Sequence, residues 1–217
     1  MRIIQCVVVL FFLMMSAHIH AQDEIKESDL IEFKSDIQRK VSETITQFAR
    51  RCIPENAAVQ HKILELPFMN PKAGKDIFVC FADSTLTDEK PTVYVELLKP
   101  WMFDGKLVYE PIFVTGFENG AEGLATVNAV FLANADKDIA KELVIIFSTN
   151  MRMYDNATNS WFIEERSEVL IFDNTADPCN LNVCLDEMEI LEKKFPVSKM
   201  PYTAQAVKAK LKALGFK

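Results

Sequence analysis

The spacing of apolar residues divides the chain into three stretches, of which the first has a helical period. Between about residues 28 and 52, apolar side chains recur at three- and four-residue steps, as they do on the buried face of an amphipathic helix. The positions that form this stripe are Leu30, Phe33, Ile37, Val41, Phe48 and Cys52. Ser28 is suited to cap the start of such a helix, and Pro54 ends it. The pattern predicts a long N-terminal helix within residues 22–54, with one face to bury against a sheet.

Residues 59–173 have the pattern of many short strands. Runs of β-branched, aromatic and aliphatic residues alternate with turn residues along this stretch. Asp104 and Gly105 fit a two-residue hairpin turn, and Pro111 marks an edge strand or a bulge. The connections are mostly too short for the crossovers that parallel strands need, so we expect mainly antiparallel pairing. The runs are 59–66, 77–81, 92–98, 106–109, 112–117, 125–132, 143–148, 161–165 and 168–172.

The third stretch predicts a short C-terminal helix over residues 203–214. Thr203 is placed to cap its start, and Val207, Leu211 and Leu214 form its apolar face. Gly215 and Phe216 complete a helix stop in which Phe216 folds back on Leu211. The expected fold class is therefore α+β: a mainly antiparallel β-sheet of many short strands, with a long N-terminal and a short C-terminal helix. At 217 residues the chain has room for one such domain, over residues 22–217.

Residues 1–21 have the pattern of a secretory signal peptide. Arg2 supplies a positive end, residues 7–15 are an apolar stretch, and Ala21 is a small residue at the predicted cut. A membrane-spanning helix needs about 20 apolar residues and this stretch is shorter, so an uncleaved membrane anchor is the less favoured alternative. We therefore expect an exported chain, periplasmic or secreted, with no transmembrane segment after signal cleavage.

The net charge and the absence of certain motifs exclude some classes of function without identifying one. The chain has 24 basic and 31 acidic residues, a formal charge of −7, which argues against a nucleic-acid partner because such proteins need a basic face. No glycine-rich phosphate loop and no nucleophile elbow occur in the sequence. These patterns favour a non-enzymatic binding or structural module for an unknown protein, polymer or small ligand.

The alternative to a binding module is an enzyme, and two groups of residues are candidates for its catalytic side chains. His61 is the only histidine after residue 21, and its place in a strand indicates a structural side chain rather than a catalytic base. Glu164, Glu165 and Glu168 could supply the two carboxyl groups of a glycosidase, although Glu164 and Glu165 are adjacent and point to opposite sheet faces. The alternative function is a hydrolase with a site built from scattered carboxylates, with or without the assistance of calcium.

Four cysteines follow the predicted signal peptide, an even number that permits disulfides in an exported protein. Cys179 and Cys184 lie five residues apart in a polar stretch that a local bridge could close. Cys52 and Cys80 would then pair with each other or remain buried thiols. A zinc site is a further alternative, although zinc sites need clustered Cys or His at short spacings and one such pair is available.

One segment carries a specific chemical pattern, with oxygen-bearing side chains at positions 1, 3, 5 and 9 of a loop between two predicted strands. Calcium collects six to eight oxygen ligands, which such a spacing helps to supply. The spacing resembles the Asp-rich calcium loop of FG-GAP and VCBS repeat proteins. This resemblance implies that Asn134, Asp136, Asp138 and Glu142 are metal ligands, with the carbonyl of Ala140 joining them. Calcium is the one candidate cofactor, and the alternative is a solvated hairpin loop with no ion.

The loop departs from that family at two positions. Ile139 stands where the family usually has a glycine for the sharp turn, and Asn134 stands where it usually has Asp. The motif also occurs once, whereas a propeller repeats it in several blades, so no propeller is predicted.

More broadly, the chain from Thr126 to its C-terminus is similar to uncharacterised exported proteins of Bacteroidota. The features that carry this similarity are the apolar run of residues 131–147 with its Asp-rich loop, the strand end at 168–174, and the closing Lys-rich helix. The resemblance implies a bacterial periplasmic or secreted setting and assigns no activity.

Overall fold

The computed structural model describes most of the chain beyond its first 36 residues. A compact unit, Ser35–Lys217, contains all of the described residues. The predicted signal peptide, the first part of the predicted N-terminal helix, and the pair Cys179 and Cys184 lie outside them. The described ranges are 37–69, 72–83, 92–117, 123, 125–138, 140–174 and 185–216.

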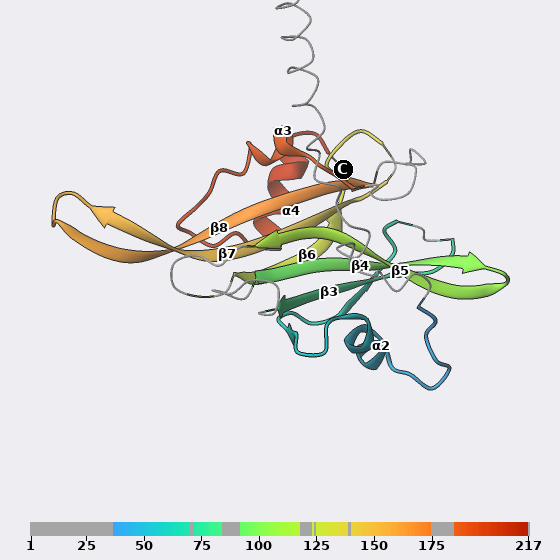
Figure 1. Ribbon diagram of the computed structural model, residues 1–217. Coiled ribbons are helices and arrows are strands. Elements are labelled where there is room, and N and C mark those ends of the chain that lie inside the picture. The colour runs from blue at the N-terminus through green and yellow to red at the C-terminus, as the bar shows by residue number, and fades with distance from the viewer. Residues whose placement is uncertain are drawn as a thin grey trace, which may run out of the picture. The chain divides into compact units, whose positions relative to one another are not determined.

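The described strands form two antiparallel sheets, as the short connections predicted (Figure 1). The first sheet has the order β1-β3-β4-β5, with β2 also pairing with β3, and the second has the order β6-β7-β8-β9. The first contains β1 (Ala58–Val59), β2 (Leu64–Leu66), β3 (Asp76–Asp83), β4 (Thr92–Phe103) and β5 (Lys106–Phe117). The second contains β6 (Thr126–Ala133), β7 (Glu142–Asp155), β8 (Ser160–Asn174) and β9 (Leu185–Glu187).

Each sheet contains one long hairpin. Strands β4 and β5 turn at Asp104 and Gly105, whose φ angles of 47° and 72° are those of the predicted two-residue turn. Pro111 lies in β5, an edge strand of the first sheet, where its missing N–H does not interrupt a ladder on both sides. Strands β7 and β8 pair continuously from Leu143 with Phe172 to Asp155 with Ser160, and their tip projects beyond the rest of the second sheet (Figure 1).

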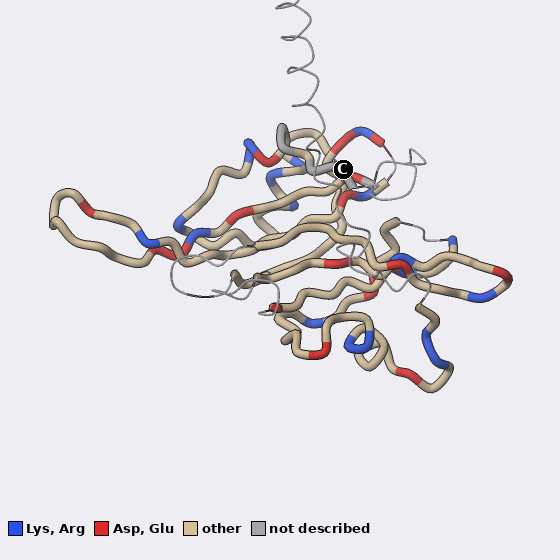
Figure 2. The backbone as a smooth tube through the Cα atoms, in the orientation of Figure 1, with Lys and Arg blue, Asp and Glu red and all other residues tan. Residues whose placement is uncertain are grey.

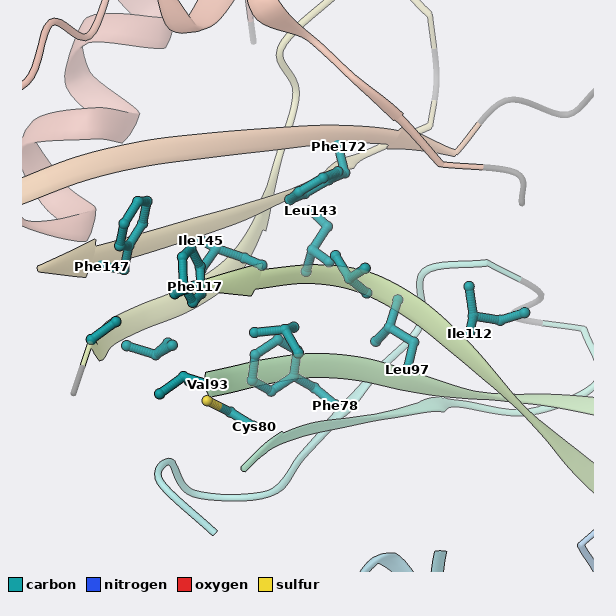
Figure 3. Close-up of a cluster of buried hydrophobic side chains, with 14 of the residues drawn as sticks. Phe78, Cys80, Val93, Leu97, Ile112, Phe117, Leu143, Ile145, Phe147 and Phe172 are labelled. Carbon is teal, nitrogen blue, oxygen red and sulfur yellow. The ribbon is translucent and has the colours of Figure 1, made fainter. Parts of the chain in front are cut away.

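Three apolar clusters hold the layers together. The inter-sheet cluster lies between the two sheets, where side chains of both point toward one another (Figure 3) and the rings of Phe117 and Phe147 stack at 4.1 Å. The α2 cluster joins the first sheet to helix α2 (Ile45–Cys52) through Phe48. The α4 cluster joins the second sheet to α3 (Glu189–Glu192) and α4 (Ala204–Ala213) through Val207 and Leu211. The unit is thus layered helix, sheet, sheet, helix.

The prediction of a long N-terminal helix is wrong, and with it the α+β fold class. Helix α2 begins at Ile45, because Thr44 and Gln47 form a capping box that starts a helix there. Upstream, Ile37 exchanges two backbone hydrogen bonds of 3.2 and 3.0 Å with Tyr109 of β5, which requires an extended backbone. Val41, a member of the predicted stripe, is fully exposed. The unit is mostly antiparallel sheet with two short helices and one additional helical turn.

The predicted C-terminal helix is confirmed at both ends, but Leu214, predicted to lie on its apolar face, is 41% exposed because the helix ends before it. The Thr203 hydroxyl accepts a 3.1 Å hydrogen bond from the amide of Ala206. After Ala213 the chain closes a Schellman motif, in which the amide of Phe216 donates to the Leu211 carbonyl and that of Gly215 to the Lys212 carbonyl. Gly215 takes a φ of 101°, which favours glycine.

The described residues contain no disulfide bridge. Cys80 is a fully buried thiol in β3, and burial raises its pKa to about 12. Cys52 is half-buried at the end of α2, where it packs against the α2 cluster. Among the described helices, none has both the length and the apolar character needed to cross a membrane.

Candidate metal centre

The candidate site is the connection between β6 and β7, residues 134–141, together with the first residue of β7, Glu142. Ala135 anchors the connection to the core, because it is 1% exposed and belongs to the α4 cluster. Acidic and basic positions alternate along this connection (Figure 2). The next residues, Asp136 and Asp138, therefore lie beside a rigid core rather than on a free loop.

Three of the four predicted ligands converge. Asp136, Asp138 and Glu142 each contribute one carboxylate oxygen to a group whose members all lie within 4.8 Å of one another. Two ligands of one calcium ion, each at about 2.3–2.6 Å from it, lie at most about 4.6–5.2 Å apart. The separation of these oxygens therefore fits a shared ion. Asp136 is half-buried and Asp138 exposed, so the group is open to solvent on one side.

Glu142 is the unusual member because its side chain is 0% exposed. Its Oε2 accepts a hydrogen bond from the backbone amide of Ala135, while its Oε1 has no hydrogen-bond partner among the described residues. Burial raises the pKa of Glu142 to about 7, and the charges of Asp136 and Asp138 add to the rise. A buried carboxylate that lacks a partner is costly, so this position favours either a proton or a cation.

Local hydrogen bonds hold the two aspartates in place. The amide of Asp138 donates to Oδ1 of Asp136 at 2.8 Å, and the amide of Ala140 donates to Oδ1 of Asp138 at 2.7 Å. Such Asx turns leave the second oxygen of each carboxylate available. Ile139, which replaces the glycine of the calcium-loop families, lies outside the described residues.

The remaining predicted ligand, Asn134, begins the same connection and is half-buried. Its side chain lines a cavity beside α4. The ligand role of the Ala140 carbonyl stays a prediction, since the described contact of Ala140 is through its amide. Oxygen donors of this kind suit a hard cation, and calcium would complete its shell with backbone oxygens and water.

The carboxylates predicted for the alternative hydrolase are not arranged as an acid–base pair. Glu164 forms ion pairs with Arg166 at 2.8 Å and with Lys199 at 2.6 Å, and these partners lower its pKa. A general acid needs the opposite shift, and Glu168, which has it, lies four residues from Glu164 along β8, about 13 Å away and beyond the roughly 5–10 Å of a glycosidase pair. Glu165 is exposed and pairs across the hairpin with Asn150, while burial raises the pKa of Glu168 on the same strand.

The contacts of His61 are with a backbone carbonyl and with an aromatic ring. Its Nδ1 lies 2.8 Å from the carbonyl oxygen of Lys62, so Nδ1 is the protonated nitrogen that donates. Its ring meets Phe78 edge-on with centroids 5.9 Å apart.

Sequence reasoning missed the buried carboxylates of Asp76 and Asp83 and the half-buried carboxylate of Glu96 in the first sheet. Asp76 is 0% exposed, and its Oδ2 accepts from the amides of Phe68 and Met69 at 3.0 and 2.7 Å, which fastens the connection between β2 and β3. Glu96 lies in β4, and burial raises its pKa to about 7. The available signal was an acidic residue within an otherwise apolar strand, Val93 to Leu98 in the case of Glu96.

Comparisons of the chain with models of known protein families, with curated proteins and with solved structures found no match.

Proposed function

We propose that the protein is a non-enzymatic, exported binding or structural module in which the β6–β7 connection holds a calcium ion. The observation that carries the proposal is the buried carboxylate of Glu142, whose Oε1 lacks a hydrogen-bond partner among the described residues and which joins Asp136 and Asp138 within 4.8 Å. A bound cation offsets both the desolvation of Glu142 and the repulsion among three carboxylates.

The ion would act as a cross-link. Asp136 and Asp138 belong to the connection, whereas Glu142 is fixed at the start of β7 and accepts a hydrogen bond from the amide of Ala135, a member of the α4 cluster. Binding to the folded state alone stabilises it by RT ln(1 + [L]/Kd), about 2.7 kcal/mol at a hundredfold excess over Kd. Calcium sites of extracellular modules have Kd values of about 10⁻⁴–10⁻³ M, which suits a site that is open on one side.

The test is a thermal melt of three proteins in calcium and in EDTA. The wild type should melt at a higher temperature in calcium, and D136N/D138N should show no calcium shift because two of the three carboxylates are gone. The matched control E55Q/E165Q removes two exposed acidic charges elsewhere and should keep the shift. A wild type that melts equally in both buffers would overturn the proposal, and so would a calcium shift that survives D136N/D138N.

The export part of the proposal rests on residues 1–21, in which a short apolar stretch over residues 7–15 is followed by a predicted cut after Ala21. The measurement is the intact mass of the protein recovered from the periplasm or medium of a bacterial host. The expected mature chain begins at Gln22, and recovery of a chain that retains Met1 would contradict it.

A further inference from the structure

A cavity of about 620 Å³ lies beside the candidate metal centre, between the end of β6 and helix α4. Its volume falls within the range of about 300–1,000 Å³ in which small-molecule sites usually lie. The cavity is lined by residues from the second sheet and from the C-terminal helix and its stop; we call its buried and half-buried apolar residues the floor and its exposed lysines the rim.

The floor is apolar. Leu132 comes from β6, Leu211 from α4, and Phe216 from the helix stop. The Schellman motif fixes Phe216 here, because its amide is hydrogen-bonded to the Leu211 carbonyl. Such a floor favours the apolar part of a ligand over water.

The rim is cationic. Lys208 and Lys212 are one turn apart on α4, and Lys141 immediately precedes β7. None of the three forms an ion pair with another described residue, although the chain as a whole carries a formal charge of −7. The Lys208 ammonium lies 4.7 Å from the centroid of the Phe131 ring. Three lysines without acidic partners around an apolar floor are complementary to one kind of molecule, an apolar chain with a negative head.

We propose that this cavity binds the anion of a medium- or long-chain fatty acid, with its alkyl chain on the apolar floor and its carboxylate among Lys141, Lys208 and Lys212. The proposal goes beyond the cation site and does not rest on it. The competing interpretation is that the lysine stems merely cover apolar surface while their heads remain in water. The two interpretations differ in whether the charge of a ligand matters.

The test is isothermal titration calorimetry of the full chain with dodecanoate below its micelle concentration, in EDTA so that the cation site plays no part. Dodecyltrimethylammonium has the same alkyl chain with the opposite charge, and acetate has the carboxylate without the chain. We expect dodecanoate to bind with a stoichiometry of one and the other two compounds to give no saturable heat. Equal affinity for the two dodecyl compounds, or no binding of dodecanoate, would overturn the proposal.

Three variants place the ligand in the cavity. K141Q/K208Q/K212Q should weaken dodecanoate binding about tenfold, since exposed ion pairs contribute modestly one by one. The control K62Q/K75Q/K106Q removes three exposed lysines outside the cavity and should bind as the wild type does. F216A removes part of the floor at the end of the chain and should also weaken binding. Wild-type affinity in either the cavity lysine variant or F216A, with a wild-type melting temperature, would refute the assignment.

Discussion

Replacing Glu142 with Gln should stabilise the protein at high pH while removing its response to calcium. The pKa of Glu142 is raised from 4.5 to about 7 in the folded protein, mainly by burial. Between these two values the folded state holds a proton that the unfolded state has lost, so the free energy of unfolding falls as the pH rises through this window. At 1.36 kcal/mol per pH unit the full interval sets an upper limit of about 3 kcal/mol. Because the exposed Asp138 opens the group to solvent, we expect about 1–2 kcal/mol.

The measurement is urea denaturation of the wild type and E142Q in EDTA at pH 5 and at pH 8. At pH 5 both side chains are neutral or nearly so, and the two proteins should have similar stability. At pH 8 E142Q should be more stable by about 1–2 kcal/mol, because the wild type then buries a charge without a partner. Calcium added at pH 8 should raise the stability of the wild type alone, since a deprotonated Glu142 is the form that binds a metal.

The control is Glu165→Gln, which removes an exposed carboxylate on β8 and should leave the difference between pH 5 and pH 8 unchanged. A stability gap between E142Q and the wild type that is the same at both pH values would refute the reasoning. A lower stability of E142Q at pH 8 would show that the carboxylate is compensated without a metal.

Three further predictions concern the first sheet and α2. Phe48→Ala should lower the free energy of unfolding by about 3–5 kcal/mol, because Phe48 is fully buried and its ring centroid lies 4.9 Å from that of Tyr109. Val41→Asp should change it by about 0.5 kcal/mol or less, because Val41 is exposed. Both values are measured by urea denaturation. Thr44→Ala should cost about 1 kcal/mol through loss of the helix cap, and Thr44→Ser should restore most of it. Cys80 should react with iodoacetamide only in denaturant, as read by mass spectrometry, since its thiol is buried with a pKa of about 12; labelling of the native protein would contradict this.

Features that depend on a few neighbouring residues were predictable from the sequence. The Asp104–Gly105 turn and the stop at Gly215 follow from residues that tolerate positive φ, and both are present. The N-terminal helix failed because Ile37 pairs with Tyr109 of a distant strand, which no local period reveals. The capping box of Thr44 and Gln47 is a local signal for a later helix start, and in the folded protein it prevails over the apolar spacing upstream of it.

The convergence of Asp136, Asp138 and Glu142 was also local, since all three belong to one short connection. The burial of Glu142 was not, because it depends on position 142 lying on the face of the second sheet that carries the α4 cluster. The cavity beside the connection lies between β6 and α4, which are far apart in the sequence. Its lysines on α4 could therefore be recognised in the sequence as a charged face of a helix, but not as the rim of a binding site.

The strand register explains why Glu142 stands out. Side chains along β7 alternate between faces, so Leu143 and Ile145 enter the inter-sheet cluster while Val144 and Ile146 enter the α4 cluster. Position 142 shares the face of Val144 and Ile146, and there an apolar residue would be the stable choice. The pairing of Ala133 with Glu142 fixes this register, because a slip by one residue would reverse the faces of the whole strand. An acidic residue at a position that the fold reserves for apolar side chains lowers stability unless something compensates it, and departures of this kind are concentrated at functional sites. The same alternation that builds the core therefore distinguishes the buried Glu142 from the half-buried Asp136 and the exposed Asp138 as the centre of the candidate site.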